Sequence, residues 1–163
     1  MSAVVTNELH VERLTQADAQ AVAAIASEME GFTIPSDYVV WMLLETNPNY
    51  CLSAKKDGAL LGYLLALKTL ENDRLFVWQL GVATEARSRS HQVLKSLGEA
   101  LAQACKTGGV HHLEFTTNKR RIHLLSRLSR SVFGSTHEIK GTVTFTDQKG
   151  SPQEETIVAL TIQ

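Results

Sequence analysis

The stretch Leu75-Phe76-Val77-Trp78-Gln79-Leu80-Gly81-Val82, followed by Thr84-Glu85-Ala86-Arg87-Ser88-Arg89-Ser90-His91-Gln92, decides the fold of this chain. Its first part is almost continuously apolar, which predicts a strand that is buried on both faces. Its second part is polar and predicts a loop. The periodic apolar pattern that comes next predicts an amphipathic helix over 93–106. A strand that feeds a loop and a helix N-terminus presents unpaired N–H groups to an anion, so this unit predicts a phosphate site.

The pattern on either side of this unit completes the prediction. It indicates further strands over 8–14, 50–55, 60–67, 112–116, 138–146 and 156–162, and helices that begin near Thr15, Pro35 and Asn118. One strand–helix–strand crossover therefore lies inside an otherwise antiparallel arrangement, which is an uncommon combination. We expect a single α/β (α+β) domain over 1–163, with a mixed, mostly antiparallel, seven-stranded sheet flanked by about four helices.

Composition excludes several classes of protein. The chain has 163 residues and a formal net charge of −1, without the basic excess of a nucleic-acid-binding protein. No apolar run approaches the ~20 residues that cross a bilayer, and the first residues lack the charged, apolar and small-residue order of a signal peptide, so we expect none. The cysteines, Cys51 and Cys105, are expected to be reduced thiols in a cytoplasmic protein. The histidines lack metal-ligand spacing, so we expect no metal.

The phosphate-site segment resembles the coenzyme A motif of the GNAT acetyltransferase family, in which a strand precedes Arg/Gln-x-x-Gly-x-Gly/Ala and a helix. Arg87 takes the leading Arg position, whereas Ser90 and Gln92 stand where the family has Gly and Gly or Ala. The resemblance implies the GNAT acyl-CoA N-acyltransferase fold and acetyl-CoA as the acyl donor. The donor contacts that it implies are Leu80, Val82, Arg87, Ser88, Arg89, Ser90, His91, Gln92 and Asn118.

One branch of that family is similar over most of the chain. The run Leu-Phe-Val-Trp-Gln at 75–79 is similar to that of the L-2,4-diaminobutyrate acetyltransferases of the ectoine pathway, as is Thr-Thr-Asn at 116–118. This similarity implies transfer of an acetyl group to a primary amine of a small molecule, such as the amino acid diaminobutyrate. It implies substrate contacts from Ser36, Tyr38, Trp78 and Gln79. Thr33 and Gln153 depart from that branch, which has Asp and His there.

Acyl transfer by this family is a direct attack of the amine on the thioester, which the Leu80 or Val82 N–H would polarise. The amine must lose a proton first, and Glu30 and Asp37 are the carboxylates that we consider as bases. Many members use a Tyr in the helix after the fifth strand as the acid. That helix has no Tyr here, and His123 is its nearest titratable residue.

A non-catalytic reading stays open at this point. The loss of glycine at 88, 90 and 92 could degrade the coenzyme site, and the side chain of Gln92 or His91 could fill the space for the pyrophosphate. The chain would then be a GNAT-like binding module. Strict alternation puts Trp78 and Gln79 on opposite faces, which makes one of them a core residue. A homodimer also stays open.

Overall fold

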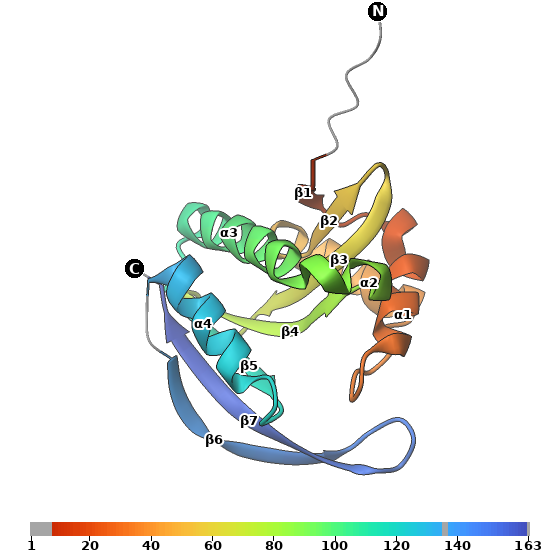
Figure 1. The fold of residues 1–163 in the computed structure, drawn as a ribbon. Coiled ribbons are helices and arrows are strands. Elements are labelled where there is room, and N and C mark those ends of the chain that lie inside the picture. The colour runs from red at the N-terminus through yellow and green to blue at the C-terminus, as the bar shows by residue number, and fades with distance from the viewer. Residues whose placement is uncertain (1–7, 135–136, 163) are drawn as a thin grey trace, which may run out of the picture.

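The computed structural model describes residues 8–134 and 137–162 as a single mixed sheet with helices on both faces (Figure 1). The strands are β1 (His10–Arg13), β2 (Leu52–Lys56), β3 (Ala59–Lys68), β4 (Arg74–Val82), β5 (His112–Thr117), β6 (His137–Thr146) and β7 (Pro152–Thr161). The α-helices are α1 (Ala19–Glu28), α2 (Asp37–Thr46), α3 (Ser90–Gly108) and α4 (Ile122–Phe133). Short 3-10 helices are η1 (Gln16–Asp18), η2 (Pro48–Tyr50) and η3 (Thr84–Arg89).

The seven strands lie in the order β1-β2-β3-β4-β5-β7-β6. Only β4 and β5 pair in parallel among the described ladders, because α3 connects them as a crossover; all other pairs are antiparallel. The predicted seven-stranded, mostly antiparallel sheet with four α-helices is therefore confirmed.

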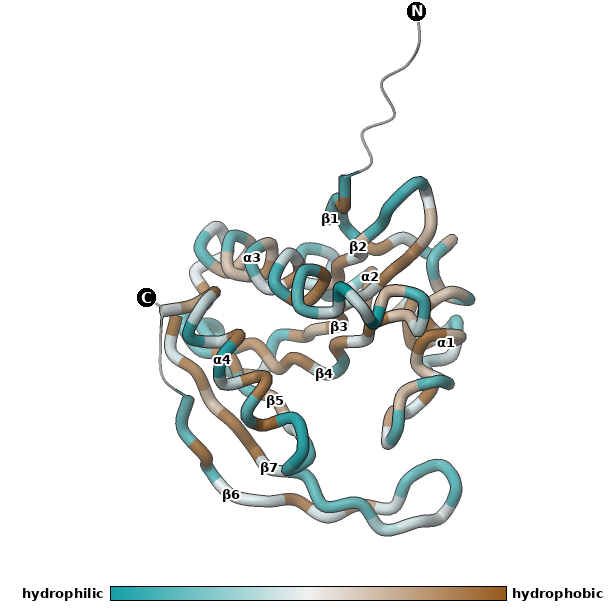
Figure 2. Tube along the Cα trace, in the orientation of Figure 1, coloured by the Kyte–Doolittle hydropathy of each residue, from teal (hydrophilic) through white to brown (hydrophobic). Residues whose placement is uncertain are grey.

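Two apolar clusters hold the layers together. One joins α3 to the sheet through Leu64, Leu97 and Leu113, and the other joins α1 and α2 to it through Val22, Val40 and Leu65. Hydrophobic residues accordingly concentrate on the central strands in Figure 2. The hairpin of β6 and β7 extends beyond the helical layers, and its turn reaches the segment after α1, where the Ile34 N–H donates to Gln148 Oε1 at 3.1 Å (Figure 1).

Two of the predicted boundaries are wrong, one because polar sequence forms helix and the other because a turn delays the start of a helix. The predicted loop over 84–92 is instead η3 followed directly by the first turn of α3. The helix predicted to begin at Asn118 begins at Ile122, because Asn118 first closes a turn in which its Oδ1 accepts the Arg121 N–H at 3.1 Å.

A β-bulge interrupts β4 at Trp78. Gln79 pairs with Leu65 and Val77 pairs with Ala66, so Trp78 is an extra residue on β4. A bulge bends its strand and increases the local twist. The ladder between β4 and β5 ends at Val77 and Phe115, although β4 continues to Val82. The two strands part where the bulge bends β4.

The glycine after the bulge is packed too closely to accept a side chain. A Cβ on Gly81 would lie 2.5 Å from Tyr63 Cε1. We expect Gly81→Ala to lower the free energy of unfolding by about 1–3 kcal/mol, because the added methyl overpacks the β3–β4 interface. Urea denaturation measures this. In the Tyr63→Leu background the same change should cost less, and equal costs in both backgrounds would contradict the packing account.

Candidate active site

A cavity of 620 Å³ occupies the place where β4 and β5 part. Its walls come from both faces of the sheet. Leu80, Val82, Leu94, Phe115 and Leu128 line it on the side of α3 and α4, and Met29, Phe32 and Trp78 line it on the side of α1. The cavity therefore passes through the sheet, and a ligand from one face can meet a ligand from the other inside it.

The register of β4 directs two backbone units into this gap. The Ala83 N–H donates to the Leu61 carbonyl of β3 at 2.8 Å. Backbone groups alternate in direction along a strand, so those of Gly81 also face β3, whereas those of Leu80 and Val82 face away from it. An extended ligand lying in the gap could pair with β4 as an added strand would.

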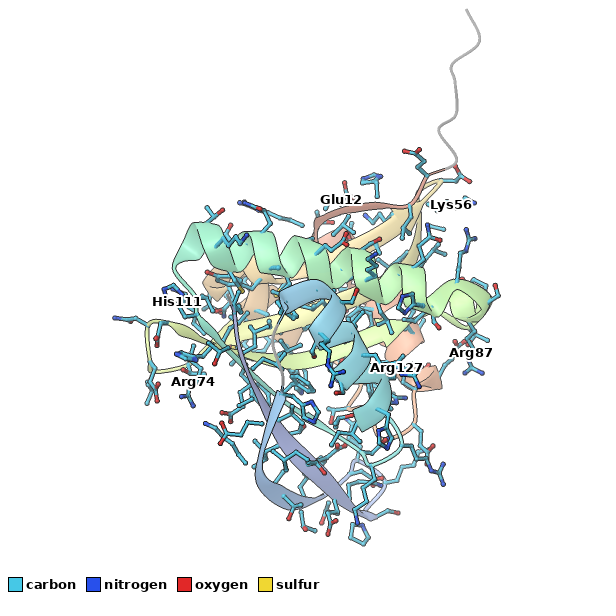
Figure 3. All side chains as sticks on the ribbon, turned by 60° about the vertical axis from the view of Figure 1, so that its left-hand side comes forward. Glu12, Lys56, Arg74, Arg87, His111 and Arg127 are labelled. Carbon is cyan, nitrogen blue, oxygen red and sulfur yellow. The ribbon has the colours of Figure 1, made fainter. Side chains whose placement is uncertain are left out.

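One end of the cavity is formed by η3 and the first turn of α3. Arg87 and Ser90 line the cavity, and Figure 3 shows Arg87 beside the N-terminal end of α3. In the described chain the one non-glycine residue with positive φ is Asp57. The backbone between Thr84 and Gln92 therefore does not need glycine, and a helix N-terminus with an arginine suits an anion.

The expectation that Gln92 or His91 could fill the pyrophosphate space is wrong. Both residues lie in α3, both are exposed, and neither lines the cavity. The reason is the helical turn that begins at Ser90, which points these side chains outward. Ser88 and Arg89 are also exposed on η3 and do not line the cavity.

The other end of the cavity is acidic. Glu30 and Glu155 line it, together with Arg121 and Asn118, whereas Glu28 lines the cavity beside η3. Glu155 is a residue that the sequence analysis missed. Its Oε2 is buried and has no hydrogen-bond partner among the described residues, and burial raises the pKa of its carboxyl while the nearby Arg121 opposes that rise. A buried, unpaired carboxylate oxygen in a cavity is suited to an ammonium group or a proton.

Arg121 is held in place on this side of the cavity. Its guanidinium carbon lies 5.4 Å from the ring centroid of Phe32, which is a cation–π geometry. Its backbone N–H donates to Asn118 Oδ1. Glu30 is exposed, and its Oε2 lies 3.9 Å from Nη1 of Arg120, which is also exposed. Glu28 accepts a hydrogen bond from the Thr84 hydroxyl, which ties α1 to η3.

The predicted substrate residues divide into two groups. Ser36 caps α2 by accepting the Val39 N–H at 3.2 Å, and Tyr38 is 68% exposed beside Trp41, so neither lines the cavity. Asp37 and His123 are also exposed and do not line it. Trp78 does line the cavity, whereas Gln79 is only 4% exposed and does not.

The prediction that Trp78 and Gln79 lie on opposite faces of the sheet is wrong, because the bulge interrupts the alternation. Trp78 packs against the cluster that contains Tyr63, and Gln79 hydrogen-bonds to Tyr63 itself, so both are on the α1 and α2 face. The Gln79 Oε1 accepts the Tyr63 hydroxyl at 2.8 Å, and the Gln79 Nε2 donates to the Thr33 carbonyl at 2.6 Å. Gln79 thus connects the core of the sheet to the segment that carries Phe32.

This bridge gives a test. We expect Gln79→Leu to lower the free energy of unfolding by about 1–3 kcal/mol, because it leaves the buried Tyr63 hydroxyl without a partner. The double variant Tyr63→Phe, Gln79→Leu should recover part of that loss, since both partners are then apolar. A double-mutant cycle in urea measures the coupling, and strictly additive costs would contradict the bridge.

The thiols take no part in the cavity's chemistry. Cys51 and Cys105 are buried, and desolvation raises the pKa of the Cys105 thiol to about 12, so it stays protonated. Within residues 8–134 and 137–162, no three His, Cys, Asp or Glu side chains are grouped as a metal site would need. No helix in the same ranges has both the length and the hydrophobicity to cross a membrane.

The family model of the acetyltransferase (GNAT) family matches residues 17–129, and the chain therefore belongs to that family. This confirms the family expected from the coenzyme A motif. No curated protein matches the chain by sequence.

Several solved structures share the fold over nearly the whole chain. Ard1 from Thermoplasma volcanium has a TM-score of 0.76 at 12% identity, covering 95% of this chain and 98% of that one. The diaminobutyrate acetyltransferase EctA from Paenibacillus lautus, in complex with L-2,4-diaminobutyric acid and coenzyme A, has a TM-score of 0.71 at 22% identity, covering 95% of both chains. A phosphinothricin acetyltransferase from Sinorhizobium meliloti, in complex with AcCoA, has a TM-score of 0.70 at 16% identity, covering 94% of this chain and 88% of that one. At these identities the likeness concerns the fold.

Proposed function

We propose that this protein transfers an acetyl group from acetyl-CoA to a primary amine of a small molecule. The observation that carries the proposal is the open cavity between β4 and β5, with the backbone of Leu80 and Val82 directed into it. The solved structures of EctA and of the phosphinothricin acetyltransferase, which contain coenzyme A or AcCoA, support the choice of donor.

In the proposed complex, the pyrophosphate lies at the N-terminus of α3 with Arg87 and Ser90. The pantetheine arm pairs with the exposed side of β4, and the Leu80 or Val82 N–H polarises the thioester carbonyl. An N–H held in place before the reaction stabilises the developing oxyanion without reorganisation, and one such donor typically contributes about 10²–10³ in rate.

The acceptor amine enters from the acidic end. A free alkyl ammonium has a pKa near ~10.4, so it must give up a proton before it attacks. We assign that proton to the Glu155 carboxylate, which lies in the cavity with an unpaired oxygen. The amine nitrogen then bonds to the carbonyl carbon, the carbon–sulfur bond breaks, and the second proton of the nitrogen passes to solvent, which leaves the amide. The coenzyme leaves as a thiolate, which takes a proton from solvent.

The acidic end also supports a cationic acceptor. Glu30 and Glu155 outnumber Arg121 among the charged residues that line it. Amino acids with a second amine, beginning with L-2,4-diaminobutyrate, are therefore the first acceptors to screen. In such a substrate Arg121 would pair with the carboxylate and Glu155 with the amine.

Donor binding tests the proposal first. We expect calorimetry to show acetyl-CoA binding at about micromolar Kd, weakened by about 10–100-fold in Arg87→Ala because a charged hydrogen bond to phosphate is lost. Gln92→Ala is the matched control, and its Kd should stay within about twofold of the wild-type value. Absence of binding by the wild-type protein would contradict the proposed donor.

Glu155 gives a test with two readouts. Glu155→Gln should lower kcat by about 10²–10⁴ with the accepted amine, because the proton acceptor is gone. The wild-type rate should fall as pH is lowered through the raised pKa of Glu155, and this limb should be absent in the variant.

Glu155→Gln should lower the rate without lowering the stability of the protein at neutral pH. A carboxyl whose pKa is raised on folding contributes stability below its unfolded pKa and loses that contribution as pH rises through its folded pKa. At neutral pH, Glu155→Gln should therefore have a Tm equal to or above that of the wild type. A variant that is both inactive and less stable would indicate a structural role instead.

A further inference from the structure

The cavity does not end where the strands part. It continues past Val77 and Phe115 into the space between α3, α4 and the sheet. Leu101, Leu113, Leu128, Ser129, Phe133 and Leu160 line this deep part. We call these six residues the deep pocket.

The deep pocket is apolar. Leu101, Leu113 and Leu160 are between 2% and 3% exposed, and Leu128 is 6% exposed. Ser129 is its one hydroxyl residue, and that hydroxyl donates to the Leu125 carbonyl of the same helix at 2.6 Å. A charged or polar group would lose its hydration here without finding a partner, whereas a hydrocarbon chain would not.

The position of the deep pocket follows from the chain direction. Helix α3 returns antiparallel to β4, so Ser90 lies near Val82, and Leu101 lies about 16 Å further along the helix axis. The proposed phosphate site is at Ser90 and the proposed thioester site is at Leu80. The stretch of β4 from Leu80 back to Val77 adds about 10 Å beyond the thioester. A two-carbon acetyl group leaves most of that length unfilled.

We propose that the donor site takes linear acyl groups longer than acetyl, with the acyl chain in the deep pocket. This inference rests on the proposed function, since it extends the same donor site. The donor is then a medium-chain acyl-CoA. The bond made and the bond broken are the same as for acetyl transfer: the amine nitrogen bonds to the acyl carbon, the carbon–sulfur bond breaks, and the amine proton passes to Glu155.

Calorimetric titration of the full-length protein with CoA, acetyl-CoA, butanoyl-CoA and octanoyl-CoA tests this. Each buried methylene favours binding, so the wild type should bind octanoyl-CoA at least about tenfold more tightly than acetyl-CoA, with butanoyl-CoA between them. Ser129→Leu fills the deep pocket and removes only a hydroxyl that bonds within its own helix. It should bring octanoyl-CoA to within about twofold of acetyl-CoA while leaving acetyl-CoA unchanged. Ser129→Ala, the matched control, removes the hydroxyl without filling space and should keep the wild-type preference.

The outcomes separate this inference from the proposed function. If acetyl-CoA binds but the longer chains bind no more tightly, the deep pocket does not hold the acyl chain and the inference is overturned. Equal weakening of all donors by Ser129→Leu would overturn it as well, because the pocket would then act only on the packing of α4. If CoA and all its thioesters fail to bind, the donor site itself is wrong and both proposals fall.

Discussion

The parting of β4 from β5 is the constraint on which the site depends, and it originates in one extra residue. Trp78 is unpaired against β3 and bends β4 at the level where the parallel ladder stops. A continuous ladder would have used the backbone of Leu80 and Val82 in the sheet. The bulge instead leaves these groups facing a cavity, and it turns Trp78 and Gln79 to the same face. One local irregularity therefore creates the gap, its backbone donors and one of its walls.

The elements around the gap place different charged residues of the protein at its two ends. The N-terminus of α3 and Arg87 lie at one end, where Glu28 bonds to η3, and Glu30 and Glu155 lie at the other. The hydrogen bonds of Gln79 fix the segment after α1 to the central strands. An open, largely apolar cavity of 620 Å³ forgoes contacts that a closed core would have. A ligand that binds only the folded state would restore part of that stability.

Much of this arrangement could be predicted from the sequence. The nearly continuous apolar run of β4 and the amphipathic pattern of α3 predicted the crossover, and Arg87 lines the cavity beside α3, where the sequence predicted an anion site. The helical turn from Ser90 could not be predicted, because Ser90, His91 and Gln92 are polar and add no apolar residue to the periodic pattern that indicated the helix. The bulge was also hidden, since the run from Leu75 to Val82 is apolar except for Gln79 and Gly81 and gives no alternation to interrupt. Glu155 was missed because its role depends on the pairing of β7 with β5, which brings it beside residues far away in the chain. Its one local signal was an acidic residue in an alternating strand.

The most direct test of the account measures hydrogen exchange of individual backbone amides by NMR, with and without coenzyme A. Coenzyme A should slow exchange at Leu80 and Val82 by about tenfold or more, because their N–H groups then pair with the pantetheine arm. The Ala83 amide, which already donates to Leu61, serves as the internal reference and should change little. Binding of coenzyme A without any change at Leu80 and Val82 would contradict the claim that the gap beside the bulge is the donor site.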